Sequence, residues 1–248
     1  MGTYIIVDSH VPKYAPELLL LFDIDGTLVR RAGPQHRQAL VSAVHAVTGF
    51  ETTTDGIPVH GMLDPDILAE MLRRAGAAPE LIARSMPVIE KEAQRVYEAT
   101  CPDLRDRTCP GAKHFLKILQ RSRVPCVLVT GNLERIGWKK LECAGLSRFF
   151  VFGSFAGTAH TRTALARNAI RLARKRGLKK AGTEVWLVGD APQDILAARA
   201  NRIRCVAVHT GVSSAQDLGR LRPDVLVKDL TQVWRKNIGP RMHTNAHE

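Results

Sequence analysis

Two aspartates, Asp23 and Asp25, directly follow the apolar run Leu18–Phe22. Strand residues two positions apart point to the same face, so we expect the two carboxyl groups to share one site, roughly 6–7 Å apart. Open parallel sheets bind their ligands beyond the carboxyl ends of their strands, where Asp23 is expected to stand. Gly26 then lets the chain turn away from the site. The alternative, a pair of acids that only hydrates a strand end, fits one aspartate better than the whole string DIDGTL.

A second apolar run, in the string VWLVGDAPQD, ends at Asp190, and Asp194 follows about one helical turn later on the same face. Carboxylates gathered at one place cannot all ionise side by side unless a cation neutralises them. Oxygen ligands of this kind suit Mg²⁺. We therefore predict a Mg²⁺ site, although Asp190 taken alone could equally be the N-cap of a helix.

A third strand is expected to end at Thr130, in the string VLVTGN. Thr130 offers a hydroxyl group, Gly131 frees the backbone, and Asn132 can cap the helix that follows. Backbone N–H groups at the start of a helix, with a hydroxyl beside them, form an anion site. This string therefore predicts a phosphate site at Thr130, Gly131 and Asn132, although strand–Thr–Gly turns also occur commonly without one.

The strings DIDGTL, VTGN and GDAPQD, in this order, resemble three of the four motifs of the haloacid dehalogenase superfamily of hydrolases. The chain is most similar to the phosphoglycolate-phosphatase-like branch, whose helical cap is inserted just after the first motif. The resemblance covers about residues 17–235.

This resemblance implies a role for each acid. Asp23 would be the nucleophile, Asp25 the general acid/base and Thr130 a phosphate ligand. Asp190 would hold Mg²⁺ together with Asp23 and a backbone carbonyl at Asp25, and Asp194 would complete the acidic set. True haloacid dehalogenases lack an acid at the position of Asp25, so the resemblance implies phosphoryl chemistry.

The family also places a cation, commonly a lysine, between its Thr motif and its last motif. No lysine occurs between Lys140 and Lys175. Some members of the branch use arginine in an R-x-x-L string, and Arg162 stands in such a string here. Because arginine can bind a phosphoryl group through two hydrogen bonds, we expect Arg162 to be this cation, with His160 and Arg167 as alternatives.

Strand-like runs alternate with helical patterns along residues 108–238, which favours βαβ units. The expected fold class is α/β, a Rossmann-like and mostly parallel sheet with helices on both faces. Residues 31–107 are mostly helical in pattern. We therefore expect an α/β catalytic core of residues 17–30 and 108–238, with a helical cap of residues 31–107 inserted in it. Residues 1–16 and 239–248 are expected to be irregular tails.

Three local expectations concern the cap and the edge of the sheet. Asp64 is expected to cap a helix that Pro65 opens. The string HGMLD, residues 60–64, resembles a cap loop of the same branch, and we expect it to select the substrate. The string FFVFGS predicts a short strand over residues 149–154.

The positive net charge of the chain favours the binding of anionic ligands. The 248 residues include 36 Lys+Arg against 24 Asp+Glu, a formal net charge of +12, and such a surface can also bind nucleic acid non-specifically. The stretch 143–183 has nine basic residues and no acidic one. No aromatic residue lies among the arginines of 162–177, so a solvated helix face explains them more simply than a nucleic-acid site does.

The expected compartment is the cytoplasm. Five cysteines, an odd number without a C-x-x-C pair, favour a reducing compartment over a disulfide framework or a zinc site. Residues 1–16 lack the order of a signal peptide, and no apolar run approaches the roughly 18 residues of a membrane span.

We therefore predict a Mg²⁺-dependent phosphatase that hydrolyses the phosphomonoester of a small anionic metabolite, with phosphoglycolate as a candidate. Asp23 would form an aspartyl phosphate, and Asp25 would move the protons. Thr130, Arg162 and the cation would neutralise the phosphoryl oxygens. Two alternatives stay open: a phosphomutase on the same scaffold, and a non-catalytic binding protein that uses the basic face.

Overall fold

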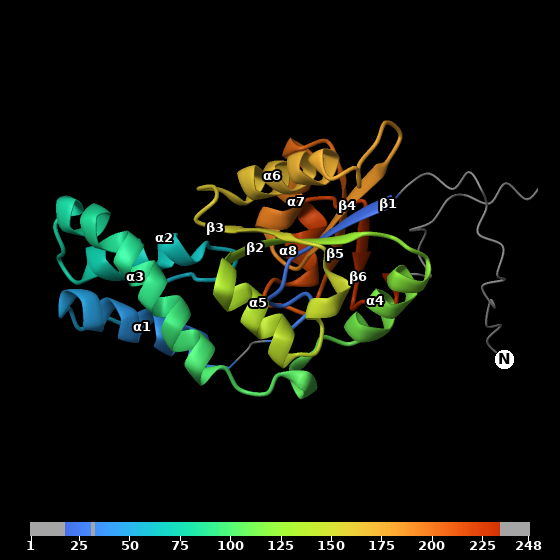
Figure 1. Ribbon diagram of the computed structural model, residues 1–248. Helices are drawn as coiled ribbons and strands as arrows, with labels where there is room; N and C mark the ends of the chain where they lie inside the picture. Colours follow the sequence, from blue (N-terminus) through green and yellow to red (C-terminus); the bar gives the residue numbers. More distant parts are fainter. Residues whose placement is uncertain (1–17, 31–32, 234–248) are drawn as a thin grey trace, which may run out of the picture.

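The structure is a computed structural model that describes residues 18–30 and 33–233 of the chain (Figure 1). The tails predicted over residues 1–16 and 239–248 lie outside the described residues.

The core is one six-stranded sheet in which every neighbouring pair of strands is parallel. The strands lie in the order β3-β2-β1-β4-β5-β6, so the first strand of the chain is central. This arrangement confirms the predicted Rossmann-like α/β fold. The strands are β1 (Leu18–Phe22), β2 (Cys126–Leu133), β3 (Gly153–Ala156), β4 (Glu184–Gly189), β5 (Arg204–Val208) and β6 (Val225–Val227).

Burial on both faces explains why β1 is wholly apolar. Leu19 and Leu21 belong to one hydrophobic cluster, with α6 (Arg162–Lys175) and α7 (Pro192–Ala200). Leu20 and Phe22 belong to the other cluster, with α4 (Ala112–Arg121) and part of α5 (Glu134–Cys143). Alternate residues of one strand therefore fill two separate cores, and no position of β1 is left for a polar side chain. The short helix α8 (Ala215–Arg220) precedes β6.

The segment between β1 and α4 forms a helical insert made of α1 (Gln35–Thr48), α2 (Asp64–Arg74) and α3 (Pro79–Thr100), followed by the 3-10 turn η1 (Arg105–Arg107). Figure 1 shows the three helices together beyond one end of the sheet. The buried face of α1 carries the apolar residues that its spacing predicts. These residues share one hydrophobic cluster with β1, so the insert and the sheet pack as neighbours.

The strand predicted over residues 149–154 begins later than expected. The 3-10 helix η2 (Ser147–Phe149) occupies the first part, and β3 covers Gly153–Ala156. Phe150 packs edge-on against Phe22, with ring centroids 5.8 Å apart. Phe149 and Phe150 therefore pack into the core without belonging to a strand. An unbroken apolar run in the sequence does not distinguish this arrangement from a strand.

The prediction that Asp64 caps α2 is wrong, because Leu63 is the N-cap and Asp64 is the first helical residue. The Asp64 carboxylate accepts a hydrogen bond of 2.8 Å from the backbone N–H of Leu133 in the core. The Asp64 side chain thus pairs with a backbone N–H of the core instead of with the first turn of its own helix.

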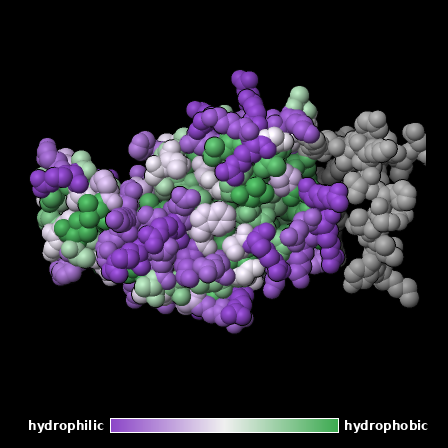
Figure 2. Space-filling view, viewed as in Figure 1, coloured by the Kyte–Doolittle hydropathy of each residue, from purple (hydrophilic) through white to green (hydrophobic). Residues whose placement is uncertain are grey.

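The basic face of α6 is exposed at Arg167, Arg171 and Arg174. Figure 2 shows hydrophilic side chains over this upper edge of the molecule. Its use as a binding surface stays a prediction. Within the described residues, no helix combines the length and apolar character that crossing a membrane requires.

Removing the Leu21 side chain should test the buried centre of the sheet. Leu21 has no exposed surface, so Leu21→Ala should lower the free energy of unfolding by about 2–5 kcal/mol through lost burial and a new cavity. Urea denaturation would measure it. Leu196→Ala is the control, because Leu196 on α7 is 47% exposed and should change stability by about 0.5 kcal/mol or less. Equal losses would contradict the central place of β1.

Candidate active site

The side chains with chemical potential meet where three neighbouring strands end. Asp23 follows β1, Thr130 lies near the end of β2, and Asp190 follows β4. Since β1 lies between β2 and β4, these ends adjoin each other. They line a cavity of about 720 Å³ that the insert also lines, through residues such as His36, Arg37, His60 and Met62. The site thus lies between the sheet and the insert, at the carboxyl ends of the strands.

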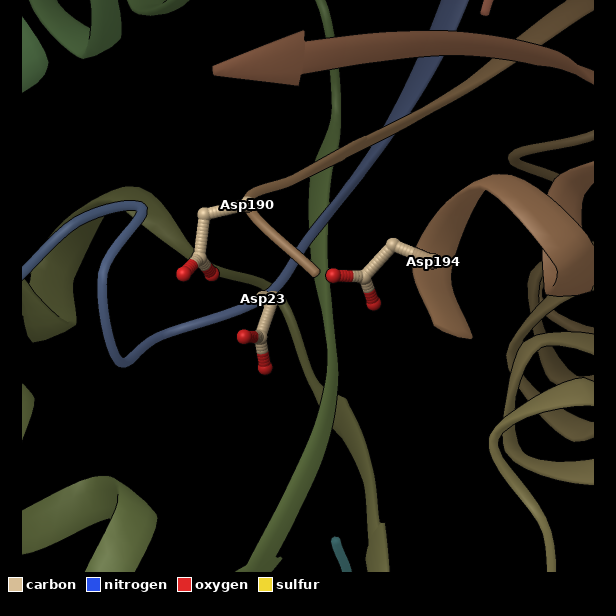
Figure 3. Close-up of side chains that lie close together, drawn as sticks. All are labelled: Asp23, Asp190 and Asp194. Atoms are coloured by element: carbon tan, nitrogen blue, oxygen red, sulfur yellow. The ribbon is translucent and has the colours of Figure 1, made fainter. Parts of the chain in front are cut away.

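Three buried carboxylates lie at the bottom of this site. Asp23, Asp190 and Asp194 each offer an oxygen, and these oxygens lie within 4.8 Å of one another (Figure 3). Thr27 donates a hydrogen bond to one Asp190 oxygen at 3.2 Å, but Asp190 Oδ2 has no donor among the described residues. An unpaired buried carboxylate oxygen beside two more acids fits a cation.

The pKa values of two acids show the cost of this crowding. Burial is the main cause that raises the pKa of Asp190 well above 3.8, and the charges of Asp23 and Asp194 add to it. The pKa of Asp194 rises to about 7, again mainly through burial, while Arg162 opposes the rise. A bound cation would reverse both shifts because it favours the ionised forms.

Two glycines leave room for the Asp190 carboxylate. A Cβ atom at Gly26 or at Gly211 would overlap this carboxylate. Gly26 also has a φ of +79°, which permits the turn after Asp25 that the sequence predicts. Gly211, in the segment after β5, is a part of the site that sequence reasoning missed.

Arg162 lies at this acidic cluster, at the first residue of α6. Its Nη1 donates to Asp23 Oδ1 at 2.8 Å, and its Nε lies 3.4 Å from Asp194 Oδ1. The alternatives His160 and Arg167 are exposed. Of the three basic residues considered from the sequence, the fold therefore brings only Arg162 to the carboxylates.

Asn132 lies in the predicted phosphate motif but does not cap the next helix. The N-cap of α5 is Leu133, and Asn132 belongs to β2. Its side-chain amide donates to Thr130 Oγ1 and to Asp25 Oδ2, each at 2.7 Å. Thr130 Oγ1 therefore accepts here, which leaves its own proton free for a ligand.

Gly131 separates these two residues and allows the insert to approach. A Cβ atom at this position would lie 2.5 Å from the backbone oxygen of Met62. The insert segment beside Met62 can therefore cross the end of β2 only because residue 131 has no side chain.

Lys140 is a second residue of the site that sequence reasoning missed. Its side chain has no exposed surface, and its Nζ donates to both oxygens of Asp25, at 2.7 and 2.8 Å. The signal in the sequence was its position, because Lys140 follows the buried Ile136 by four residues and so falls on the inner face of α5. A lysine on an apolar helix face needs a buried partner.

The pKa of the Asp25 carboxyl lies below 3.8. Burial by itself raises it, but the charge of Lys140 and the hydrogen bonds from Lys140 and Asn132 outweigh burial. The side chain remains 40% exposed on the cavity side. Asp25 is therefore an ionised proton acceptor that a ligand in the cavity can reach.

The string expected to select the substrate, residues 60–64, contributes four residues to the cavity wall. His60 is hydrogen-bonded to Ser213 Oγ at 2.9 Å and lies 3.8 Å from Asp190 Oδ2. Burial lowers the pKa of His60, and the charge of Asp23 opposes that change. A neutral imidazole from the insert thus reaches the acidic cluster.

Known proteins share this architecture. The chain is 29% identical over 219 residues to the phosphoglycolate phosphatase of Agrobacterium fabrum, a match that covers 85% of this chain and 88% of the relative. A predicted phosphoglycolate phosphatase from Haemophilus somnus superposes with a TM-score of 0.65 at 20% identity, over 88% of this chain and 96% of that one. A β-phosphoglucomutase from Clostridium difficile superposes with a TM-score of 0.63 at 18% identity, over 87% and 92%.

The two structural matches establish the shared fold, and the curated relative agrees with the predicted phosphatase-like branch. The family model of the haloacid dehalogenase-like hydrolases matches residues 18–201, well over half of the chain. The match spans all three motif strings, including DIDGTL at β1 and GDAPQD after β4. The protein is therefore a member of the haloacid dehalogenase-like hydrolase family.

Proposed function

We propose that this hydrolase is a Mg²⁺-dependent phosphatase that cleaves phosphomonoesters of small metabolites through an aspartyl phosphate on Asp23. The observation that carries the proposal is the composition of one buried site: Asp23 lies beside Asp190 and Asp194 and is hydrogen-bonded to Arg162. A nucleophilic carboxylate, a set of oxygen ligands and a fixed guanidinium are the parts that phosphoryl transfer requires.

The residues present fit a magnesium ion. Asp23 and Asp190 would hold it, together with the backbone carbonyl of Asp25, and the unpaired Asp190 Oδ2 is the atom that most needs it. Asp194 would support the metal ligands without being one of them. Its carboxylate forms an ion pair with Arg162 and accepts a hydrogen bond of 3.1 Å from the backbone N–H of Ala191. When bound, the ion supplies positive charge to the phosphoryl oxygens and keeps the carboxylates ionised.

The protein groups divide the work of binding and attack. The Asp23 carboxylate attacks phosphorus, and the bond to the leaving oxygen breaks as the aspartyl phosphate forms. Arg162 holds Asp23 in place and offers donors to the phosphoryl oxygens. The Thr130 hydroxyl has a free proton for another of these oxygens because its own oxygen accepts from Asn132.

Asp25 would carry the protons in both half-reactions. A phosphate dianion that enters the cavity adds negative charge beside Asp25 and raises its pKa, so that the group can hold a proton for the leaving alcohol. After the alcohol departs, the ionised Asp25 takes a proton from the attacking water. The pKa of Asp25, which is lowered in the site without substrate, suits this second step.

The proposed substrate class is a small phosphorylated acid such as phosphoglycolate, the substrate named for the curated relatives. The cavity volume of about 720 Å³ lies within the usual range for small-molecule sites. All five cysteines are free, which fits the predicted cytoplasmic setting.

A phosphomutase remains the second candidate. The insert lines the cavity together with the sheet, which would restrict the access of water to an aspartyl phosphate. Measurement of phosphate release and of sugar-phosphate isomerisation on the same sample separates the two reactions. The third reading, a non-catalytic binding protein, leaves the gathered acids and their paired cations without a role.

Metal removal should abolish activity and change stability. EDTA should stop phosphate release, and Mg²⁺ should restore it. The pKa of Asp194 is about 7 in the metal-free fold, against 3.8 as the reference. A raised carboxyl pKa means that the metal-free protein loses stability as the pH rises from about 4 through 7. Mg²⁺ should therefore raise the Tm more at pH 8 than at pH 6, and Asp190→Asn should remove most of this shift. Full activity in metal-free buffer would contradict the assignment.

Arg162→Ala should lose far more activity than Arg167→Ala, because Arg162 is hydrogen-bonded to Asp23 whereas Arg167 is exposed. We expect a loss on the order of 10²-fold or more in kcat/KM for Arg162→Ala, as for other removed charge-stabilising donors. Circular dichroism of both variants controls for folding. A larger loss from Arg167→Ala would show that the family's cation was placed on the wrong residue.

Substitution of the two first acids should separate their roles. Asp23→Asn removes the attacking oxygen anion, so no phosphoenzyme should form with any substrate. Asp25→Asn keeps the nucleophile, and a nitrophenolate leaves without protonation. The Asp25→Asn enzyme should therefore release a burst of nitrophenol from p-nitrophenyl phosphate, and alkyl phosphates should slow by on the order of 10²–10⁴-fold. A rapid-mix assay with Mg²⁺ measures both, and a burst from Asp23→Asn would reverse the assignment.

A further inference from the structure

We propose that Lys140 positions Asp25 for proton transfer and that His36 of the insert completes this positioning only when the insert covers the core. The inference rests on the proposed acid/base role of Asp25. It assigns a task to a buried lysine that lies outside all three motif strings.

Lys140 is a buried ammonium group with every proton satisfied. An ammonium group has three N–H donors, and burial without acceptors would be costly. The Lys140 Nζ donates to the Asp25 carboxylate, to Asn132 Oδ1 at 2.6 Å and to His36 Nδ1 at 3.1 Å. The three protons therefore lie among four acceptor atoms of three side chains, which together hold the ammonium group in place.

This arrangement fixes the direction of the Asp25 carboxylate. Both Asp25 oxygens accept from Lys140, and Oδ2 also accepts from Asn132. Asn132 is held in turn by Lys140 and by Thr130. The proposed proton carrier and the proposed phosphate ligand Thr130 thus belong to one hydrogen-bond network, in which Lys140 contacts Asp25 directly and Thr130 only through Asn132.

The insert supplies one acceptor of this network. His36 lies on α1, and its Nε2 is 3.2 Å from the Asp64 carboxylate on α2. Because Nδ1 faces the ammonium group and Nε2 faces a carboxylate, the neutral ring with its proton on Nε2 satisfies both neighbours. The chain of contacts returns to the core at Leu133, whose backbone N–H donates to Asp64.

Movement of the insert away from the core would break this chain at two points, His36–Lys140 and Asp64–Leu133. Lys140 would then lose its acceptor from the insert, His36 Nδ1, and the Asp25–Lys140 pair would be free to shift toward other partners. Full alignment of Asp25 therefore coincides with coverage of the cavity. An enzyme built in this way holds its proton carrier in place only when bulk water is shut out.

Three variants test the proposal. Lys140→Met keeps the length of the side chain and removes its donors. His36→Phe keeps an aromatic ring against Tyr97, whose ring centroid lies 5.6 Å from that of His36, and removes the acceptor. Lys139→Met is the matched control, because Lys139 is the next residue on α5 and forms an ion pair with Glu142 at the surface.

The readout is the split between leaving groups, measured in single turnovers with Mg²⁺ after thermal melts have shown that each variant folds. Lys140→Met should slow phosphorylation by an alkyl phosphate by on the order of 10²-fold, yet leave the nitrophenol burst from p-nitrophenyl phosphate within about threefold of the wild type. His36→Phe should show the same split with a smaller loss, about two- to tenfold, as expected for one lost hydrogen bond. Lys139→Met should match the wild type.

The double variant tests the link through Lys140. If His36 acts through Lys140, Lys140→Met combined with His36→Phe should be no slower than Lys140→Met alone. Additive losses would overturn the role of His36, and equal slowing of both substrates would reduce Lys140 to a structural ion pair. If Lys140→Met does not fold, the split in His36→Phe decides the proposal. A wild type that releases no phosphate, or an Asp23→Asn enzyme that still gives a burst, would instead overturn the proposed function.

Discussion

Negative charge concentrated at the carboxyl ends of a buried sheet is the constraint on which the rest of this site depends. Carboxylates at such a place are stable only where cations or hydrogen-bond donors meet them. Two helices of the core each supply one cation: Arg162 of α6 binds Asp23, and Lys140 of α5 binds Asp25. Asp190 lacks such a partner, and its raised pKa marks the place where positive charge is still needed.

The pairing of each acid with its own cation gives two neighbouring aspartates different properties. Asp23 lies in the buried acidic cluster, whereas Asp25 faces the cavity and has a pKa held below 3.8 by Lys140 and Asn132 against the effect of burial. One environment suits a nucleophile and the other a group that exchanges protons with ligands. This separation by environment is the physical basis for different roles in one short string.

The insert takes part in the site through its backbone as well as its side chains. Gly131 gives its Met62 segment room above β2, and Asp64 binds the backbone of Leu133. His36 and His60 then reach two different carboxylates of the core, one through Lys140 and one directly. The fold alone does not choose between hydrolase and mutase, since both kinds of protein superpose on it.

The sheet, the helical stretch after β1 and the gathering of the acids could be predicted from the amino-acid sequence. Apolar runs that end in aspartate or threonine predict parallel strands, and the carboxyl ends of neighbouring parallel strands adjoin whatever the loops do. The partners of Lys140, the roles of Asp64 and Asn132 away from helix caps, and the late start of β3 became visible only in the folded structure. Each of these depends on contacts made when the whole chain is packed: Lys140 meets an acid 115 positions away in the chain, and Asp64 meets a backbone group 69 positions away. Local propensity depends only on residues that are close in the sequence. It therefore does not reveal partners that folding brings together from distant positions.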